Sequence, residues 1–311
     1  ASDDPGAPVG SAAWAPGDKL SGTTADDTPL TFNIGALATG SQDVGIGSYA
    51  DVVAVTVEWE NGSATTNVHV SANVYPHCYA STESINRVYD GLVADAVTAV
   101  GRIAVRCVKG THATIAIGRG QHAADARAMA SNSGDSLAYG LFQPTADTPG
   151  AAAGFAEEWG TEGAQQFVAG VADSAAPRYY NVGMRIQGGQ DVEAGNYFDT
   201  AVASVLFEGG KSSSTLSIAS SVAENCMITA TQVTLPAYAA SGAASVDGTG
   251  TVGVRCVKGT VASITLGRGA GFTSTRNMRG SEGLLAYELY QPESNTPGAA
   301  AGSAGLNRPC R

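Results

Sequence analysis

The stretch GRIAVRCVKGTHATIAIGRG at residues 101–120 returns, little changed, as GTVGVRCVKGTVASITLGRG at residues 250–269. In both copies valine or isoleucine alternates with other residues on either side of a cysteine, a period of two that is typical of β-strands. Each copy follows another cysteine at nearly the same spacing, with Cys78 before Cys107 and Cys226 before Cys256. The pattern predicts the order strand, cysteine, loop, strand, present twice.

The repeat extends well beyond this stretch at a nearly constant offset. Upstream, GSYAD at residues 47–51 matches GNYFD at residues 195–199, and downstream Leu-Ala-Tyr occurs at 137–139 and again at 285–287. A repeat this long is a whole domain and not a solenoid turn. Counted from its first cysteine, a complete unit covers residues 78–208. On this basis we predict that residues 1–60 form the second half of a domain, that 61–77 and 209–225 are linkers with a strand, and that 226–311 form the first half of a domain.

Composition limits the functional classes. The chain has 311 residues, a formal net charge of −11 and only 14% charged residues. Without a Lys/Arg cluster to neutralise phosphates, nucleic acid is not an expected partner. No apolar run approaches the roughly 20 residues of a membrane span. No signal peptide is present, and we interpret the chain as a mature, exported protein because its cysteines form matched pairs.

The cysteine positions predict the pairs Cys78–Cys107 and Cys226–Cys256, because the two pairs occupy equivalent places in equivalent domains. Cys310 has no counterpart in the first unit, so we expect it to be free or bonded outside this chain.

A strand is predicted directly before the first cysteine of each unit. Residues 66–74 and 214–222 alternate apolar and polar side chains, so each strand must bury one face. The residues on those faces are Val68, Val70, Ala72 and Val74 in the first strand, and Leu216, Ile218, Ser220 and Val222 in the second. The Gly/Ser run 209–214 is predicted to be a flexible linker. Further predictions are strands at 30–37 and 52–59, the latter with Val53, Val55, Val57 and Trp59 on one face, and a short helix at 164–168.

Catalytic patterns are weak. The histidines at 69, 77, 112 and 122 lack the spacing of metal ligands, and Ser212–Ser214 has no nucleophile signature. Asp51 and Asp199 follow Gly-x-Tyr, where a turn or strand-capping role is favoured over acid–base catalysis. We therefore predict no enzyme activity and no catalytic, metal or cofactor site.

The ordered motifs resemble a known family. A leading Cys is followed by G-x-[IV]-x-V-x-C, by R-x-M before L-x-Y, and by G-Q-D-V-x-x-G-x-Y-x-D before an alternating last strand. This order resembles the spore coat protein U domain, whose family includes pilins of archaic chaperone–usher pili. The resemblance implies tandem immunoglobulin-like β-sandwiches of pilin type, each completed by a donor strand, with 66–74 and 214–222 as donors.

The same resemblance implies a structural subunit of an extracellular pilus, with identical subunits, a periplasmic chaperone and an outer-membrane usher as partners. The alternative is a secreted adhesin or carbohydrate-binding module, which predicts an exposed aromatic patch in residues 145–176. We further expect that the two half-domains join head to tail between subunits. Closure within one chain, or a chain that is a window of ordinary two-domain pilins, are the competing interpretations.

Overall fold

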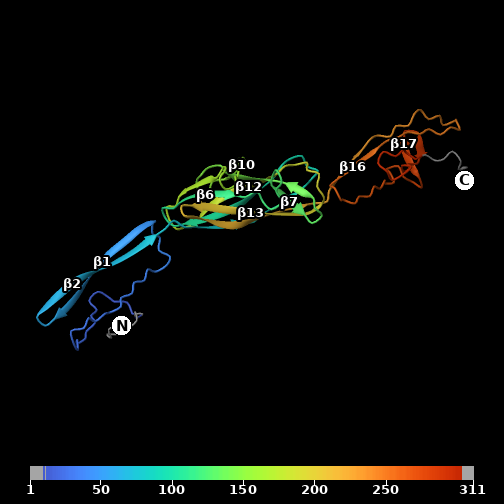
Figure 1. Ribbon diagram of the computed structural model, residues 1–311. Helices are drawn as coiled ribbons and strands as arrows, with labels where there is room; N and C mark the ends of the chain where they lie inside the picture. Colours follow the sequence, from blue (N-terminus) through green and yellow to red (C-terminus); the bar gives the residue numbers. More distant parts are fainter. Residues whose placement is uncertain (1–9, 11, 303–311) are drawn as a thin grey trace.

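A computed structural model describes residue 10 and residues 12–302, and these form an all-β fold in three parts along an elongated chain (Figure 1). We call the parts the first hairpin (47–74), the central sandwich (78–222) and the open segment (226–302). The all-β prediction is confirmed. Among the described residues no helix has the length and apolar character to cross a membrane. Cys310 lies outside the described residues.

The first hairpin consists of β1 (Gly47–Trp59) and β2 (Gly62–Val74). The strands pair in an antiparallel register that runs from Gly47 opposite Val74 to Trp59 opposite Gly62. A turn at residues 60–61 joins them. No other strand of the described residues pairs with this hairpin.

The central sandwich has two sheets. The first has the strand order β10-β9-β12-β5-β3, with bounds β3 (Cys78–Glu83), β5 (Val97–Cys107), β9 (Gly140–Pro144), β10 (Ala153–Glu158) and β12 (Arg178–Ile186). The second has the order β11-β6-β13-β14-β4, with bounds β4 (Ile85–Tyr89), β6 (His112–Ile117), β11 (Phe167–Val171), β13 (Gly195–Phe207) and β14 (Gly210–Val222). The short strands β7 (Ala128–Ser131) and β8 (Ser136–Ala138) join the second sheet through β13.

The hydrophobic core lies between these two sheets. Alternating side chains of β5, β6, β12, β13 and β14 point inward, as the period of two requires. The largest buried side chains are Trp159, Tyr89, Tyr180, Tyr197, Phe167, Ile85, Ile103, Ile115 and Ile117. Among the described residues, Val257 is the one member of the buried hydrophobic core that comes from outside the sandwich.

The open segment repeats the first part of the sandwich without closing. It contains two hairpins, β15 (Cys226–Ala230) with β16 (Val252–Cys256), and β17 (Arg276–Gly280) with β18 (Gly283–Tyr287). The residues equivalent to β6, at 261–266, form no strand because no neighbouring strand pairs with them. Apolar residues whose counterparts in the sandwich are fully buried are exposed here: Val252, Val254, Ile264, Leu266, Met278 and Leu289.

Three local predictions were wrong. Residues 164–168 form no helix, because 164–165 lie in a bend and Phe167 and Val168 already belong to β11. Residues 30–37 form no strand, because no strand of the described chain takes the place beside them that β5 and β9 take beside β12. The Gly/Ser run 209–214 is not a flexible linker, because all of it beyond the turn residue Gly209 belongs to β14.

Candidate strand-complementation site

Strand β14 completes the central sandwich by lying between β13 and β4. A turn at residues 208–209 joins it to β13, and every residue of β14 has a partner in β13, from Gly210 opposite Phe207 to Val222 opposite Gly195. On its other edge β14 runs parallel to β4, with Ile218 opposite Ile85. Parallel neighbours cannot be joined by a tight turn, so β14 reaches the edge of β4 through its hairpin with β13 and not through a direct connection to β4.

The inward face of β14 is buried as its alternation predicts. Leu216 and Ile218 are 0% and 1% exposed, and Ser220 and Val222 are also buried. The buried hydroxyl of Ser220 donates a hydrogen bond of 2.9 Å to the carbonyl oxygen of Arg87. Full burial of one Leu or Ile side chain contributes roughly 1.5–3 kcal/mol. Without β14, the core residues that it covers and the neighbouring edges of β13 and β4 would be open to water.

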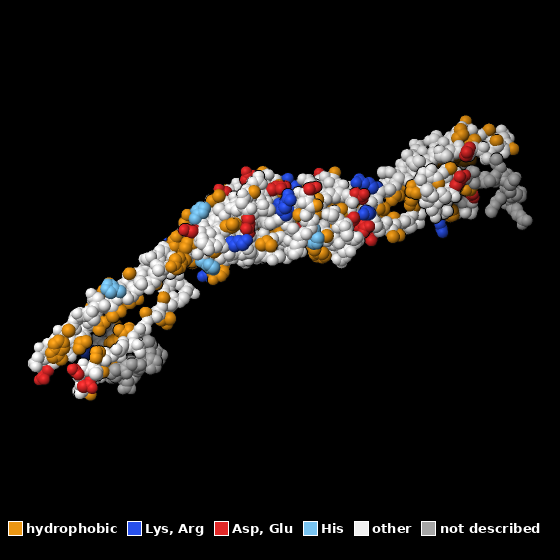
Figure 2. Space-filling model, in the orientation of Figure 1, with side chains coloured by type: hydrophobic (Ala, Val, Ile, Leu, Met, Phe, Trp, Pro, Cys, Tyr) orange, Lys and Arg blue, Asp and Glu red, His pale blue; other side chains and the backbone are white. Residues whose placement is uncertain are grey.

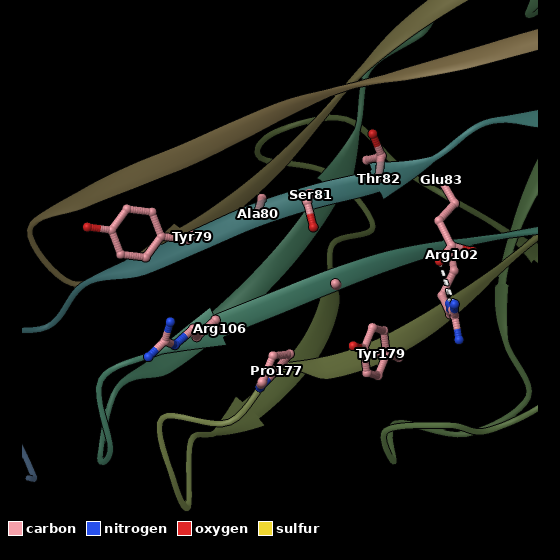
Figure 3. Close-up of a pocket in the computed structure, with 10 residues that line it drawn as sticks. Tyr79, Ala80, Ser81, Thr82, Glu83, Arg102, Arg106, Pro177 and Tyr179 are labelled. Atoms are coloured by element: carbon pink, nitrogen blue, oxygen red, sulfur yellow. Dashed lines mark hydrogen bonds and ion pairs between the residues drawn. The ribbon is translucent and has the colours of Figure 1, made fainter. Parts of the chain in front are cut away.

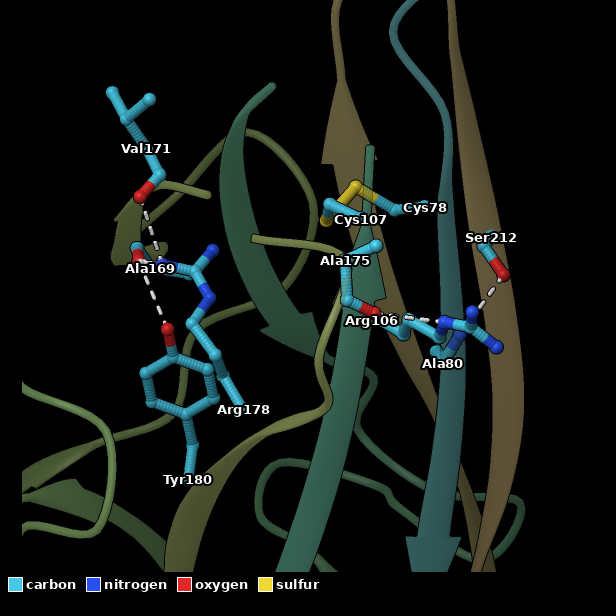
Figure 4. The surroundings of a disulfide bond; sticks show 10 residues. All are labelled: Cys78, Ala80, Arg106, Cys107, Ala169, Val171, Ala175, Arg178, Tyr180 and Ser212. Carbon is cyan, nitrogen blue, oxygen red and sulfur yellow. Dashed lines mark hydrogen bonds between the residues drawn. A yellow bond between two sulfur atoms is a disulfide. The ribbon is translucent and has the colours of Figure 1, made fainter. Parts of the chain in front are cut away.

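The serine-rich start of β14 also contacts the free edge of the first sheet, at β3. The amide of Ala80 donates to the Ser212 hydroxyl at 3.2 Å, and Thr82 Oγ1 lies 3.1 Å from the hydroxyl of Ser214. Thr82 Oγ1 also donates to the carbonyl oxygen of Thr215 at 2.6 Å. Figure 4 shows the Ser212–Ala80 contact beside the disulfide. These hydroxyls therefore connect the two sheets and give the segment its order.

The two disulfides occupy equivalent places. Cys78 is bonded to Cys107 across β3 and β5, and Cys226 is bonded to Cys256 across β15 and β16. Each disulfide therefore links two paired strands of its unit, β3 with β5 or β15 with β16. The first cysteine of each disulfide follows shortly after the preceding strand, β2 or β14. Closing a loop of this length stabilises a domain by about 3–4 kcal/mol in the chain-entropy model.

A buried carboxylate on β13 holds the second sheet to the loop after β6. One oxygen of Asp199 accepts hydrogen bonds from the Gln121 amide at 2.9 Å and from the ring of His122 at 3.1 Å, with the His122 amide at 3.3 Å. The other oxygen accepts the Tyr139 hydroxyl at 2.6 Å. The loop approaches closely because Gly120 has φ +100°, and a Cβ there would lie 2.0 Å from the carboxylate.

Two further side chains support this loop. Burial and the hydrogen bond to Asp199 raise the pKa of Tyr139, so the phenol stays protonated and donates. Arg127 donates to the carbonyl oxygens of Ile117 and Trp159 at 2.9 and 2.8 Å, and burial lowers its pKa. The predicted turn or capping role of Asp199 was wrong, because the residue sits inside a paired strand. The repeated Tyr-x-Asp was the sequence signal for this network, but the pattern alone does not reveal the partners.

The first hairpin is the counterpart of β13–β14 without a sandwich around it. Its strands have the same lengths and the same pairing as β13 and β14. The residues equivalent to the inward face of β13 are open to solvent here: Val53, Val57 and Trp59 are exposed, and Val55 is half-buried. Figure 2 shows hydrophobic side chains on the surface of this part of the chain. On β2, Val68 and Val74 are half-buried, Ala72 is exposed and Val70 is 37% exposed. The predicted burial of this face, Val68, Val70, Ala72 and Val74, is therefore not met in this chain, because no sheet of the described residues covers it.

The connection between consecutive units is built twice in the same way. The carbonyl oxygen of Lys109 accepts the Ile46 amide at 2.9 Å, and that of Lys258 accepts the Ala194 amide at 3.0 Å. At the second junction the ammonium of Lys258 also contacts both oxygens of Asp135 at 3.0 and 3.1 Å. These contacts raise the pKa of Lys258. The Glu193 amide and Lys258 together lower the pKa of Asp135.

Other surfaces of the described residues are weaker candidates for a functional site. A groove of about 390 Å³ lies over β3, β5 and the start of β12, but the Arg102 guanidinium in it already pairs with Glu83 and lies 4.7 Å from the ring centre of Tyr179 (Figure 3). In residues 145–176, Trp159 and Phe167 are buried and Phe155 is half-buried beside Phe142, so these aromatic side chains do not form the exposed patch expected of an adhesin. The described residues contain no His/Cys/Asp/Glu group suited to a metal.

The chain was compared with curated proteins and with solved structures. No curated protein matches the chain. Among solved structures, a chaperone–tip adhesion subunit complex (CsuC–CsuE) of Acinetobacter baumannii is 17% identical, covering 74% of this chain and 86% of that chain with a TM-score of 0.44. The CooA pilin of enterotoxigenic Escherichia coli is 9% identical, covering 47% and 97% with a TM-score of 0.30. A family 123 glycoside hydrolase of Clostridium perfringens is 11% identical, covering 47% and 27% with a TM-score of 0.28.

The family comparison covers most of the chain. The model of the Spore Coat Protein U domain matches residues 64–204 and 212–305, about three quarters of the sequence. Each match begins within the strand that precedes the first cysteine of a unit, β2 or β14. The strand that completes one unit is therefore the opening strand of the next match, and the chain belongs to the Spore Coat Protein U domain family.

Proposed function

We propose that this protein is a structural subunit of an extracellular pilus-type filament, in which each unit is completed by the strand that opens the next one. The observation that supports the proposal is β14, which opens the second family match yet lies in the sheet of the preceding unit. The donor strand acts within one chain here, and strand addition of this kind uses main-chain pairing for affinity and alternate side chains for specificity.

Polymerisation, in this proposal, uses the two open parts of the chain. The first hairpin presents the apolar face of a β13–β14 pair, and the open segment presents the exposed halves of the β5, β6 and β7 equivalents. In the central sandwich the equivalents of these two surfaces cover each other. A hairpin of one subunit would close the open segment of another, and because this contact is heterologous and need not close into a ring, it would extend into a filament.

The same exposed surfaces give a reason for assembly partners. Unpaired strand edges and large apolar patches promote aggregation before a subunit reaches its neighbour. A periplasmic chaperone that covers the hairpin or the open segment, followed by an outer-membrane usher, would protect the subunit during export. The adhesin alternative is not proposed, because residues 145–176 lack the aromatic surface it requires.

The test uses one strand and its two faces. Val70→Asp places a charge on the face of β2 that assembly would bury, where an unpaired charge is costly. His69→Asp places the same charge on the opposite, exposed face. We expect wild type and His69→Asp to form fibres in electron micrographs, while Val70→Asp stays monomeric with an intact sandwich. Normal fibres from Val70→Asp would contradict strand addition by the first hairpin.

A further inference from the structure

We infer that the buried carboxylate network of the sandwich is rebuilt between two copies of this chain, with Asp51 of one copy docking against Tyr287 and the loop 267–271 of a second copy. This inference rests on the proposed head-to-tail assembly and adds the polar contact that fixes its register. The template is the Asp199 network of the central sandwich. The counterpart of its carboxylate lies on the first hairpin, and the counterparts of its donors lie on the open segment.

The acceptor side is already formed in the open segment. Arg276 donates to the carbonyl oxygen of Gly267 at 3.0 Å and to that of Leu266 at 3.4 Å, as its counterpart in the sandwich does to the loop after β6. Gly269 has φ +87°, matching the left-handed glycine of the template, and the Tyr287 hydroxyl lies 3.4 Å from the Cβ position of that glycine. The glycine, the tyrosine and the arginine are therefore in place, and the carboxylate is missing.

The donor side is on the first hairpin. Asp51 lies opposite Val70 in β1–β2, just as Asp199 lies opposite Ile218 in β13–β14. Asp51 is exposed, and its carboxylate accepts a hydrogen bond from the neighbouring Val52 amide at 2.8 Å. Once docked, its carboxylate would accept the amides of residues 270 and 271 and the tyrosine hydroxyl. A glycine replaces the template histidine at position 271, so the ring contact is lost.

This contact would select one register. In the sandwich Val205 lies opposite Ile115 and Ala203 opposite Ile117. The equivalent pairing sets Val57 opposite Ile264 and Val55 opposite Leu266. A slip of one residue would turn the apolar face outward, and a slip of two would keep that face inward but bury the carboxylate away from its donors. A buried charge without partners is strongly destabilising, so the network excludes the slip that apolar packing alone tolerates.

A first experiment tests docking without relying on the network. In a Cys310→Ser background, Val57→Cys with Ile264→Cys should form disulfide-linked ladders on a non-reducing gel after mild oxidation. Val57→Cys with Leu266→Cys, the slip of two residues, should form few. If neither pair crosslinks, the proposed head-to-tail assembly fails, and this inference fails with it. Equal ladders from both pairs would show docking without a fixed register and would overturn the inference alone.

A second experiment tests the network by a double-mutant cycle on the dissociation of assembled subunits. Asp51→Ala and Tyr287→Phe should each weaken assembly by about 10-fold or more, since each removes one partner of a buried, charged hydrogen bond. The double variant should be weakened by less than the product of the two. Tyr290→Phe is the control, because the sandwich has phenylalanine at the equivalent position, Phe142. If the two effects simply multiply, the side chains do not meet and the inference is refuted, whatever the crosslinks show.

Discussion

Truncating the inward face of β14 should separate the strand that is already inserted from the one that awaits a partner. Ile218 is 1% exposed and lies opposite Ile85, inside the closed sandwich. Ile218→Ala removes three buried carbons, worth about 2.4 kcal/mol at about 0.8 kcal/mol each, plus a cavity term, for a total of about 3–4 kcal/mol. Val70→Ala, at the equivalent position of β2, should lower the unfolding free energy of the sandwich by less than about 0.5 kcal/mol, because Val70 lies outside its core.

Urea unfolding followed by tryptophan fluorescence measures both effects. Trp159 is buried in the sandwich and reports its unfolding, and replacing the exposed Trp14 and Trp59 by Phe in every variant removes their background. The Ile218→Ala midpoint should fall while the slope of the transition stays unchanged. Equal shifts for the two variants, or an Ile218→Ala midpoint that does not move, would refute the view that β14 is an integral strand of the preceding unit.

Three further outcomes are expected. Reducing the Cys78–Cys107 disulfide should destabilise the sandwich by about 3–4 kcal/mol, read as a lower urea midpoint with dithiothreitol; an unchanged midpoint would contradict this. Gly120→Ala should destabilise it by more than about 2 kcal/mol, because both the positive φ and the close carboxylate resist a Cβ; a melting temperature equal to wild type would be inconsistent. The Glu193 amide and Lys258 hold the pKa of Asp135 below its usual range, so these contacts stabilise the junction above about pH 4, the unfolded-state pKa range, and the stabilisation is lost as pH falls through the folded-state value; X-ray scattering should show the chain bending more freely in acid, and a profile that does not change with pH would contradict this.

The alternation of apolar and polar side chains along the sequence predicts much of this fold. The inward positions of β13 and β14 could be read from the sequence because apolar side chains recur with a period of two, and Leu216 and Ile218 are buried as that period implies. The Gly/Ser run before them could not be read correctly. Its composition is typical of a linker, yet Ser212 and Ser214 find partners on β3, which only the tertiary fold brings near.

The polar site was harder to predict for a related reason. An aspartate next to a turn-like Gly-x-Tyr motif resembles a cap, and its burial depends on donors from a loop far away in the sequence. Val70 illustrates the opposite limit. Its alternation predicts a buried face, but whether that face is covered depends on a partner that the described residues of this chain do not supply.

The parallel pairing of β14 with β4 has a mechanical consequence. Tension applied along the chain, as in the proposed filament, would enter the sandwich near Cys78, at the start of β3, and leave it at Val222, where β14 ends beside the next unit. The chain runs from β3 into β4, and β4 lies parallel to β14, with Val222 opposite Tyr89. Pulling the two ends apart would therefore slide β14 lengthwise against β4 and β13 and load their ladder hydrogen bonds together. A strand pulled sideways would lose them one at a time. Each unit would thus resist tension as a shear clamp, with its strength set by a rate of forced unfolding.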